Sequence, residues 1–105
     1  MVIKEVIKEL KTSNTPVINT LLATRETEII VIGLKEGVML KEHTAPTTAK
    51  LVVIKGKVNF TTPDAVHLLK RYDEHAIPLK VPHSVTAVED AVCLLILSRQ
   101  LDTPK

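Results

Sequence analysis

Four histidines and one cysteine are the side chains of this chain best suited to metal binding, proton transfer or nucleophilic attack. They are His43, His67, His75, His83 and Cys93. The sequence has no serine, histidine and carboxylate constellation, no phosphate-cradling glycine loop and no paired cysteines. Nucleophilic catalysis and nucleotide binding therefore lack support, and general acid/base chemistry lacks a paired acid. A functional site has to be built mainly on histidine.

Cys93 lies inside the longest apolar run, from Ala91 to Leu97. No histidine is near it in the sequence to activate the thiol. We therefore predict that Cys93 packs as a small buried hydrophobe and does not act as a nucleophile.

His43 and His83 each lie close to a proline, Pro46 and Pro82. Two interpretations are open: the imidazoles line a pocket, or they are structural side chains that cap strands. Strand alternation favours the pocket, because successive side chains point to opposite faces. On this basis His43 shares a face with Met39, Lys41 and Ala45, and His83 shares one with Val85 and Ala87.

His67 and His75 are candidates of a second kind. His75 follows an acidic turn, Asp73-Glu74. Most histidines in such places are simple surface residues, so we interpret both as exposed and without a site role.

The elements that must position these side chains are short strands separated by turn signals. Apolar and β-branched runs alternate with Gly, Pro, Asn and Asp clusters from Val17 onward, and helical spacing occurs only in Val2 to Lys11. The predicted strands are 17–24, 28–34, 38–42, 50–54, 57–61, 66–70, 76–79, 84–89 and 91–98. Lys55-Gly56 is a pair suited to a hairpin turn with a residue at positive φ. The pattern predicts an all-β sandwich or barrel with little helix.

Two of these runs, Leu51 to Ile54 and Val92 to Leu97, are apolar on both faces. A sheet with one solvent face would alternate with polar residues, so both faces of these strands should be covered. A barrel packed inside and covered outside by a second copy explains this pattern. We therefore predict a homodimer.

Composition narrows the class of partner. The 105 residues include 14 basic and 12 acidic side chains, which give a net charge of +2, and Phe60 and Tyr72 are the only aromatic rings. Without a basic run or stacking platforms, nucleic acid is not an expected partner. No apolar run approaches the roughly 20 residues of a spanning helix, and no signal-peptide region is present, so we expect a cytoplasmic protein with no membrane partner.

Two stretches, Gly37 to Gly56 and Tyr72 to Ala87, resemble the two sequence motifs of the cupin family. Members of this family are small jelly-roll barrels that hold a metal or ligand between their sheets. The first motif is a glycine, two histidines, a glutamate and a glycine, and its positions fall on Gly37, His43, Ala45, Ala49 and Gly56. The second is glycine, proline, glycine, histidine and asparagine, and its positions fall on Tyr72, Pro78, Lys80, His83 and Ala87.

The resemblance implies one antiparallel jelly-roll β-barrel domain over residues 1–105. It also implies a family ligand set of three histidines and a glutamate, of which this chain keeps only His43 and His83. Catalytic and structural zinc sites use about three or four protein ligands. We therefore expect no metal cofactor, with His43 and His83 as candidates for weak divalent metal binding only.

The leading functional hypothesis is a catalytically degenerate cupin that binds a small polar or anionic molecule. The predicted pocket residues are Met39, Lys41, His43, Ala45, Ala49 and His83. Lys41, together with Lys80, would favour an anion if both lysines approach the imidazoles. Two alternatives stay open: a metal-dependent isomerase or dioxygenase with a residual site on His43 and His83, and a dimeric structural module whose barrel is filled by its own side chains.

Overall fold

A computed structural model describes the backbone of residues 1–43 and 47–98 and the side chains of these residues except Glu42 and His43. One helix and nine strands are found in this part of the chain. They are α1 (Val2–Leu10), β1 (Val17–Ala23), β2 (Thr27–Leu34), β3 (Met39–His43), β4 (Thr48–Lys55), β5 (Val58–Thr61), β6 (Val66–Leu69), β7 (Glu74–Ile77), β8 (His83–Ala87) and β9 (Ala91–Ser98). Each strand overlaps one predicted from the sequence.

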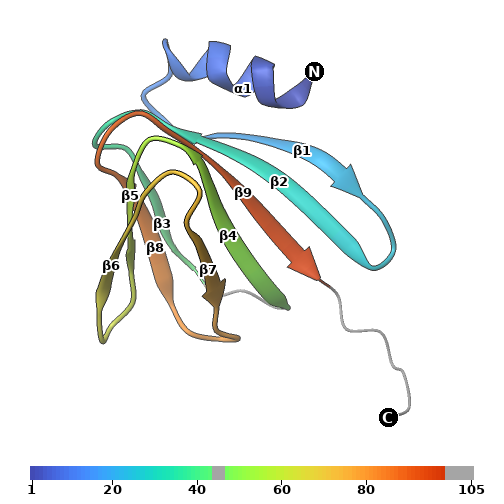
Figure 1. Ribbon diagram of the computed structural model, residues 1–105, viewed down its shortest axis with the longest axis vertical. Coiled ribbons are helices and arrows are strands. Elements are labelled where there is room, and N and C mark those ends of the chain that lie inside the picture. The colour runs from blue at the N-terminus through green and yellow to red at the C-terminus, as the bar shows by residue number, and fades with distance from the viewer. Residues whose placement is uncertain (44–46, 99–105) are drawn as a thin grey trace.

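The strands form two antiparallel sheets. One sheet has the order β1-β2-β9-β4-β7 and the other has the order β3-β8-β5-β6. The chain crosses repeatedly from one sheet to the other, as Figure 1 shows, and the two sheets enclose the core. The predicted all-β, antiparallel jelly-roll architecture with little helix is confirmed.

Alternation along each strand builds the main core. In β9, Cys93 faces inward with Leu95 and Leu97, and the paired strands β2 and β4 add Ile32 and Leu51 to the same cluster. Phe60 of β5 is fully buried there and is the largest of the fully buried side chains in the described residues. The core is otherwise aliphatic, as the scarcity of aromatic residues requires.

Helix α1 covers part of the outer face of the five-stranded sheet. Its buried residues, Val6 and Leu10, pack against Val17, Val31 and Val92 in a second apolar cluster. The helix approaches the sheet closely at Gly33, where an added Cβ would lie 2.7 Å from Cγ1 of Val6. Figure 1 shows α1 beside β1 and β2, away from the four-stranded sheet. Strand β9 is apolar on both faces, and the helix covers part of its outer face.

Four turn residues adopt the left-handed backbone region. They are Gly37 at φ +81°, Gly56 at +76°, Tyr72 at +75° and Lys80 at +59°. All four positions are those at which the two cupin motifs carry glycine. Glycine reaches this region without the steric cost that a Cβ imposes. This explains why the motifs carry glycine at these positions. At Gly56 a Cβ would also overlap the carbonyl oxygen of Asp90.

No helix within residues 1–43 and 47–98 is long and apolar enough to cross a membrane.

Candidate functional site

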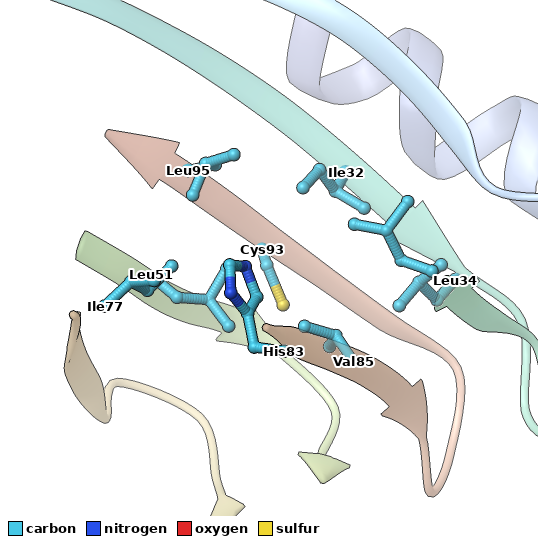
Figure 2. Close-up of a pocket in the computed structure, with 9 residues that line it drawn as sticks. Ile32, Leu34, Leu51, Ile77, His83, Val85, Cys93 and Leu95 are labelled. Atoms are coloured by element: carbon cyan, nitrogen blue, oxygen red, sulfur yellow. The ribbon is translucent and has the colours of Figure 1, made fainter. Parts of the chain in front are cut away.

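A small cavity lies between the two sheets in the interior of the barrel. Among the described side chains its walls are almost wholly aliphatic, and the one imidazole among them belongs to His83 (Figure 2). The lining residues are Ile32, Leu34, Leu40, Leu51, Ile77, His83, Val85, Cys93 and Leu95. The volume open to the centre of a water-sized sphere is about 10 Å³. Since one water needs about 10–15 Å³ on this measure, the cavity admits about a single water molecule.

His83 enters this cavity from the first position of β8 and is only 2% exposed. Its Nδ1 lies 3.1 Å from the carbonyl oxygen of Val81. A carbonyl oxygen only accepts hydrogen bonds, so this contact places a proton on Nδ1. The imidazole also stacks on Phe60, with ring centres 5.1 Å apart and planes 20° apart. These contacts hold the ring in one orientation.

Cys93 faces the same cavity from β9 and is 1% exposed. Burial raises the pKa of its thiol to about 12. The thiol is therefore protonated at neutral pH, although an imidazole shares the cavity with it. This state is that of a buried hydrophobe and not of an activated nucleophile, in agreement with the sequence-based interpretation.

The predicted face of β3 has to be corrected. Met39 is 49% exposed and Lys41 is exposed, whereas Leu40 lines the cavity. The pairing with β8 explains the difference: Leu40 lies opposite Val85 and His43 lies opposite His83, so β3 holds one extra residue between the two pairs. Such an irregularity breaks the simple alternation that placed His43 on one face with Met39 and Lys41.

The remaining predicted pocket residues have different outcomes. The backbone pairing sets His43 opposite His83, as a shared site would require, but the side chain of His43 and all of Ala45 lie outside the described residues. Ala49 is 3% exposed and belongs to the main core, paired with Ile77 and Leu97. Lys80 is exposed and does not line the cavity. The pocket role of this set therefore stays a prediction, and of its described side chains only that of His83 lines the cavity.

A run of aromatic rings connects the core to the barrel edge. Phe60 contacts His75 at 4.6 Å between ring centres in addition to stacking on His83, and His75 contacts His67 at 4.8 Å. His67 is exposed, but His75 is partly buried. Burial lowers the pKa of His75, and the nearby His67 lowers it further.

Sequence reasoning missed this run. Both histidines were expected to be exposed surface residues. His67 is exposed, but the contacts between the two imidazoles were not expected. The available signal was alternation: His67 and Leu69 share one face of β6, and His75 and Ile77 share one face of β7. The registers then set His67 opposite Phe60 and His75 opposite Leu51, both of which face the core.

Solved structures of cupins have the same fold as this chain. A cupin superfamily protein from Desulfitobacterium hafniense superposes with a TM-score of 0.78 at 16% identity, covering 84% of this chain and 81% of that protein. An RmlC-like cupin from Desulfovibrio desulfuricans gives a TM-score of 0.74 at 25% identity, with coverages of 80% and 82%. This chain has the cupin fold.

A third cupin, from Methanocaldococcus jannaschii, is described as a double-stranded β-helix and matches with a TM-score of 0.74 at 21% identity, covering 84% of each chain. No protein-family model and no curated protein matches the sequence. The fold is therefore shared with cupins whose sequences have diverged widely from this one.

The metal ligand set of the cupin motifs does not fit the described residues of this chain. Where the motif carries glutamate, the chain has the buried methyl group of Ala49, which donates nothing. The His83 imidazole lines the aliphatic cavity, contacts the Val81 carbonyl and stacks on Phe60. Within residues 1–41 and 47–98, no three His, Cys, Asp or Glu side chains come close enough together to hold an ion.

Proposed function

We propose that this cupin is a non-enzymatic binding protein whose ligand is a small, mainly apolar molecule with one hydrogen-bonding group. The cavity carries the proposal: aliphatic side chains from both sheets surround one oriented imidazole, that of His83. Ligand sites are typically apolar concavities with a few placed polar groups. An imidazole offers a polar contact without a fixed charge, so a neutral ligand fits better than an ion.

This proposal changes the ligand class expected from the sequence. An anion would need a cation beside it, because burying an unpaired carboxylate is very costly. Neither Lys41 nor Lys80 lines the cavity, and both are exposed. A neutral hydroxyl-bearing molecule meets no such penalty.

Binding requires the cavity to expand, because its present volume of about 10 Å³ suits about one water molecule. Leu40 and Leu95 are the wall residues most able to move, since both are only partly buried whereas Leu51 is 1% exposed. We expect these two leucines to shift when a ligand enters.

The test compares two ring compounds of similar size, cyclopentanol and cyclopentanecarboxylate, by titration followed through amide NMR shifts. Cyclopentanol should give saturable shifts in β8 and β9, with affinity at least tenfold above that of the carboxylate. Leu95→Phe, which fills the cavity, should abolish these shifts, while the matched surface change Leu68→Ala should preserve them. Tighter binding of the carboxylate, or shifts that survive Leu95→Phe, would contradict the proposal.

The small cavity also favours a second candidate, a structural module whose barrel is filled by its own side chains. It predicts no saturable shifts with any small ring compound, while the fold and assembly persist. The same titration therefore separates the two functions.

The third possibility, a metal-dependent enzyme on His43 and His83, is tested by elemental analysis after dialysis against a weak chelator. Two imidazoles fall short of the three or four ligands of zinc sites, so we expect no stoichiometric metal. Retained metal that is lost in His43→Ala would favour the enzyme.

We also propose that the protein is a homodimer. A strip on the outer face of the five-stranded sheet is not covered by α1 and consists of partly buried or exposed apolar residues. This outer strip comprises Leu22, Ile29, Val52 and Ile96. Leu94 lies beside the strip and packs against the α1 cluster. A second copy would remove the strip from water.

A further inference from the structure

The imidazoles of His67 and His75 meet at the seam between the two sheets. β6 is one of the two edge strands of the four-stranded sheet, and β7 is one of the two edge strands of the five-stranded sheet. The ring centres are 4.8 Å apart and the ring planes are inclined by 39°. This pair is separated from His83 by Phe60, which contacts both His75 and His83. It is therefore distinct from the cavity described above.

The separation of the rings matches that of two imidazoles bound to one metal ion. A zinc–nitrogen bond of about 2.0–2.1 Å, plus about 1.1 Å from nitrogen to ring centre, sets each ring centre about 3.2 Å from the ion. Bond angles between those of octahedral and tetrahedral sites then place the two ring centres about 4.5–5.2 Å apart. The observed 4.8 Å falls inside this range.

The surrounding structure holds the two rings in place. The turn between β6 and β7 is closed by two hydrogen bonds: the Lys70 amide donates to Oδ2 of Asp73 at 2.8 Å, and the Asp73 amide donates to the Lys70 carbonyl at 2.9 Å. Phe60 packs against the His75 ring from the core side. His67 is exposed, so an ion can reach the pair from solvent. The closed turn and the Phe60 contact therefore limit how far the two rings can move apart.

We propose that His67 and His75 form a peripheral binding site for a borderline divalent transition-metal ion of the Zn²⁺, Ni²⁺ or Cu²⁺ type. Imidazole nitrogen suits these ions, whereas Mg²⁺ and Ca²⁺ require oxygen ligands. No third protein donor joins the pair among the described side chains, so water completes the coordination and the ion exchanges readily. The bound ion ties together the edge strands of two different sheets and stabilises the barrel.

Calorimetric titration with zinc chloride at pH 7.5, in a buffer that does not bind zinc, tests the site. The wild-type chain should bind one zinc ion per protein chain. The amide NMR shifts caused by zinc should concentrate in β6 and β7. His67→Phe and His75→Phe keep a ring in each position but remove its nitrogens, so each should weaken zinc affinity at least tenfold. Because His67 is exposed, the first variant is expected to fold normally.

Two further variants serve as controls. His67→Phe combined with Leu68→His keeps the number of histidines but moves one imidazole to the opposite face of β6, and it should bind zinc as weakly as His67→Phe alone. His43→Ala should retain wild-type affinity. Three results would overturn the proposal: no saturable zinc binding by the wild type, unchanged zinc binding by His67→Phe, or loss of zinc binding in His43→Ala. The contact of His67 with His75 would then be a packing contact between two rings and not a metal site.

Discussion

Lys80 adopts a backbone conformation that L-residues other than glycine enter at a cost. Its φ is +59°, and its side chain is exposed. The left-handed region costs a residue with a Cβ about 1–2 kcal/mol, part of which is offset because glycine loses more conformational entropy on folding. We predict that Lys80→Gly raises the free energy of unfolding by up to about 1 kcal/mol. Urea denaturation measures the change.

Tyr72, at φ +75°, provides a comparison, because it and Lys80 are the two motif glycine positions that carry another residue in this chain. Its ring lies 5.1 Å below the guanidinium carbon of Arg71, a contact that glycine would lose. Tyr72→Gly should therefore stabilise less than Lys80→Gly. Destabilisation by Lys80→Gly would show that its side chain makes a contact worth more than the backbone strain.

His75 couples the stability of the barrel to pH. Burial and the neighbouring His67 lower its pKa in the folded state, so the unfolded chain binds more protons once the pH falls through the ordinary histidine pKa, about 6.5. Its contribution is fully present above that pH and is lost as the pH falls toward the lower folded pKa. We predict that His75→Phe flattens the fall of stability between pH 7 and 5. Urea denaturation with a chelator present measures it, and an unchanged slope would contradict the assignment.

At the scale of elements, α1 is held to the sheet by one apolar face. Leu10 is 1% exposed and packs in the cluster with Val17, Val31 and Val92, whereas Lys4 is exposed on the opposite side of the helix. Leu10→Ala should lower the free energy of unfolding by about 2–4 kcal/mol, because it removes buried methyl groups and leaves a cavity. Lys4→Ala should change it by less than about 0.5 kcal/mol.

Chemical denaturation of both α1 variants measures these values. Equal effects of the two substitutions would mean that α1 contributes little to the folded barrel. A large loss in Leu10→Ala alone would show that the helix is an integral cover of the outer sheet face.

At the scale of the whole molecule, the outer strip predicts the assembly state. A standard dimer interface buries on the order of 1,500 Å² in total. We predict a solution mass of twice the 11.6 kDa of one chain. Leu22, which is 45% exposed, lies at the edge of the strip. Leu22→Glu should therefore shift the mass toward the monomer without unfolding it.

Sedimentation equilibrium at micromolar concentration, with circular dichroism as a folding check, measures this shift. Leu68→Glu is the matched control, because Leu68 is 50% exposed on the other sheet, away from the strip. A wild-type monomer, or dissociation by the Leu68 substitution alone, would show that the strip is not the interface.

The sequence by itself determined the local features of this protein. Apolar periodicity distinguished the helical spacing before Lys11, where a helix or a strand arm was possible, from the strands after Val17, and turn chemistry placed Gly56 at positive φ. Motif spacing indicated the cupin barrel, and the apolar surroundings of Cys93 indicated a buried thiol. These inferences succeeded because period, turn residues and local composition act over a few neighbouring positions.

Only the tertiary structure decided which side chains share a space. The extra residue in β3 put Leu40, and not Met39, in the cavity, since a shift of one residue exchanges the two faces of a strand. The contact of His67 with His75 depends on two edge strands of different sheets, a relation that no local pattern encodes. The cavity size likewise depends on how side chains from both sheets interlock, because packing is a property of the assembled core.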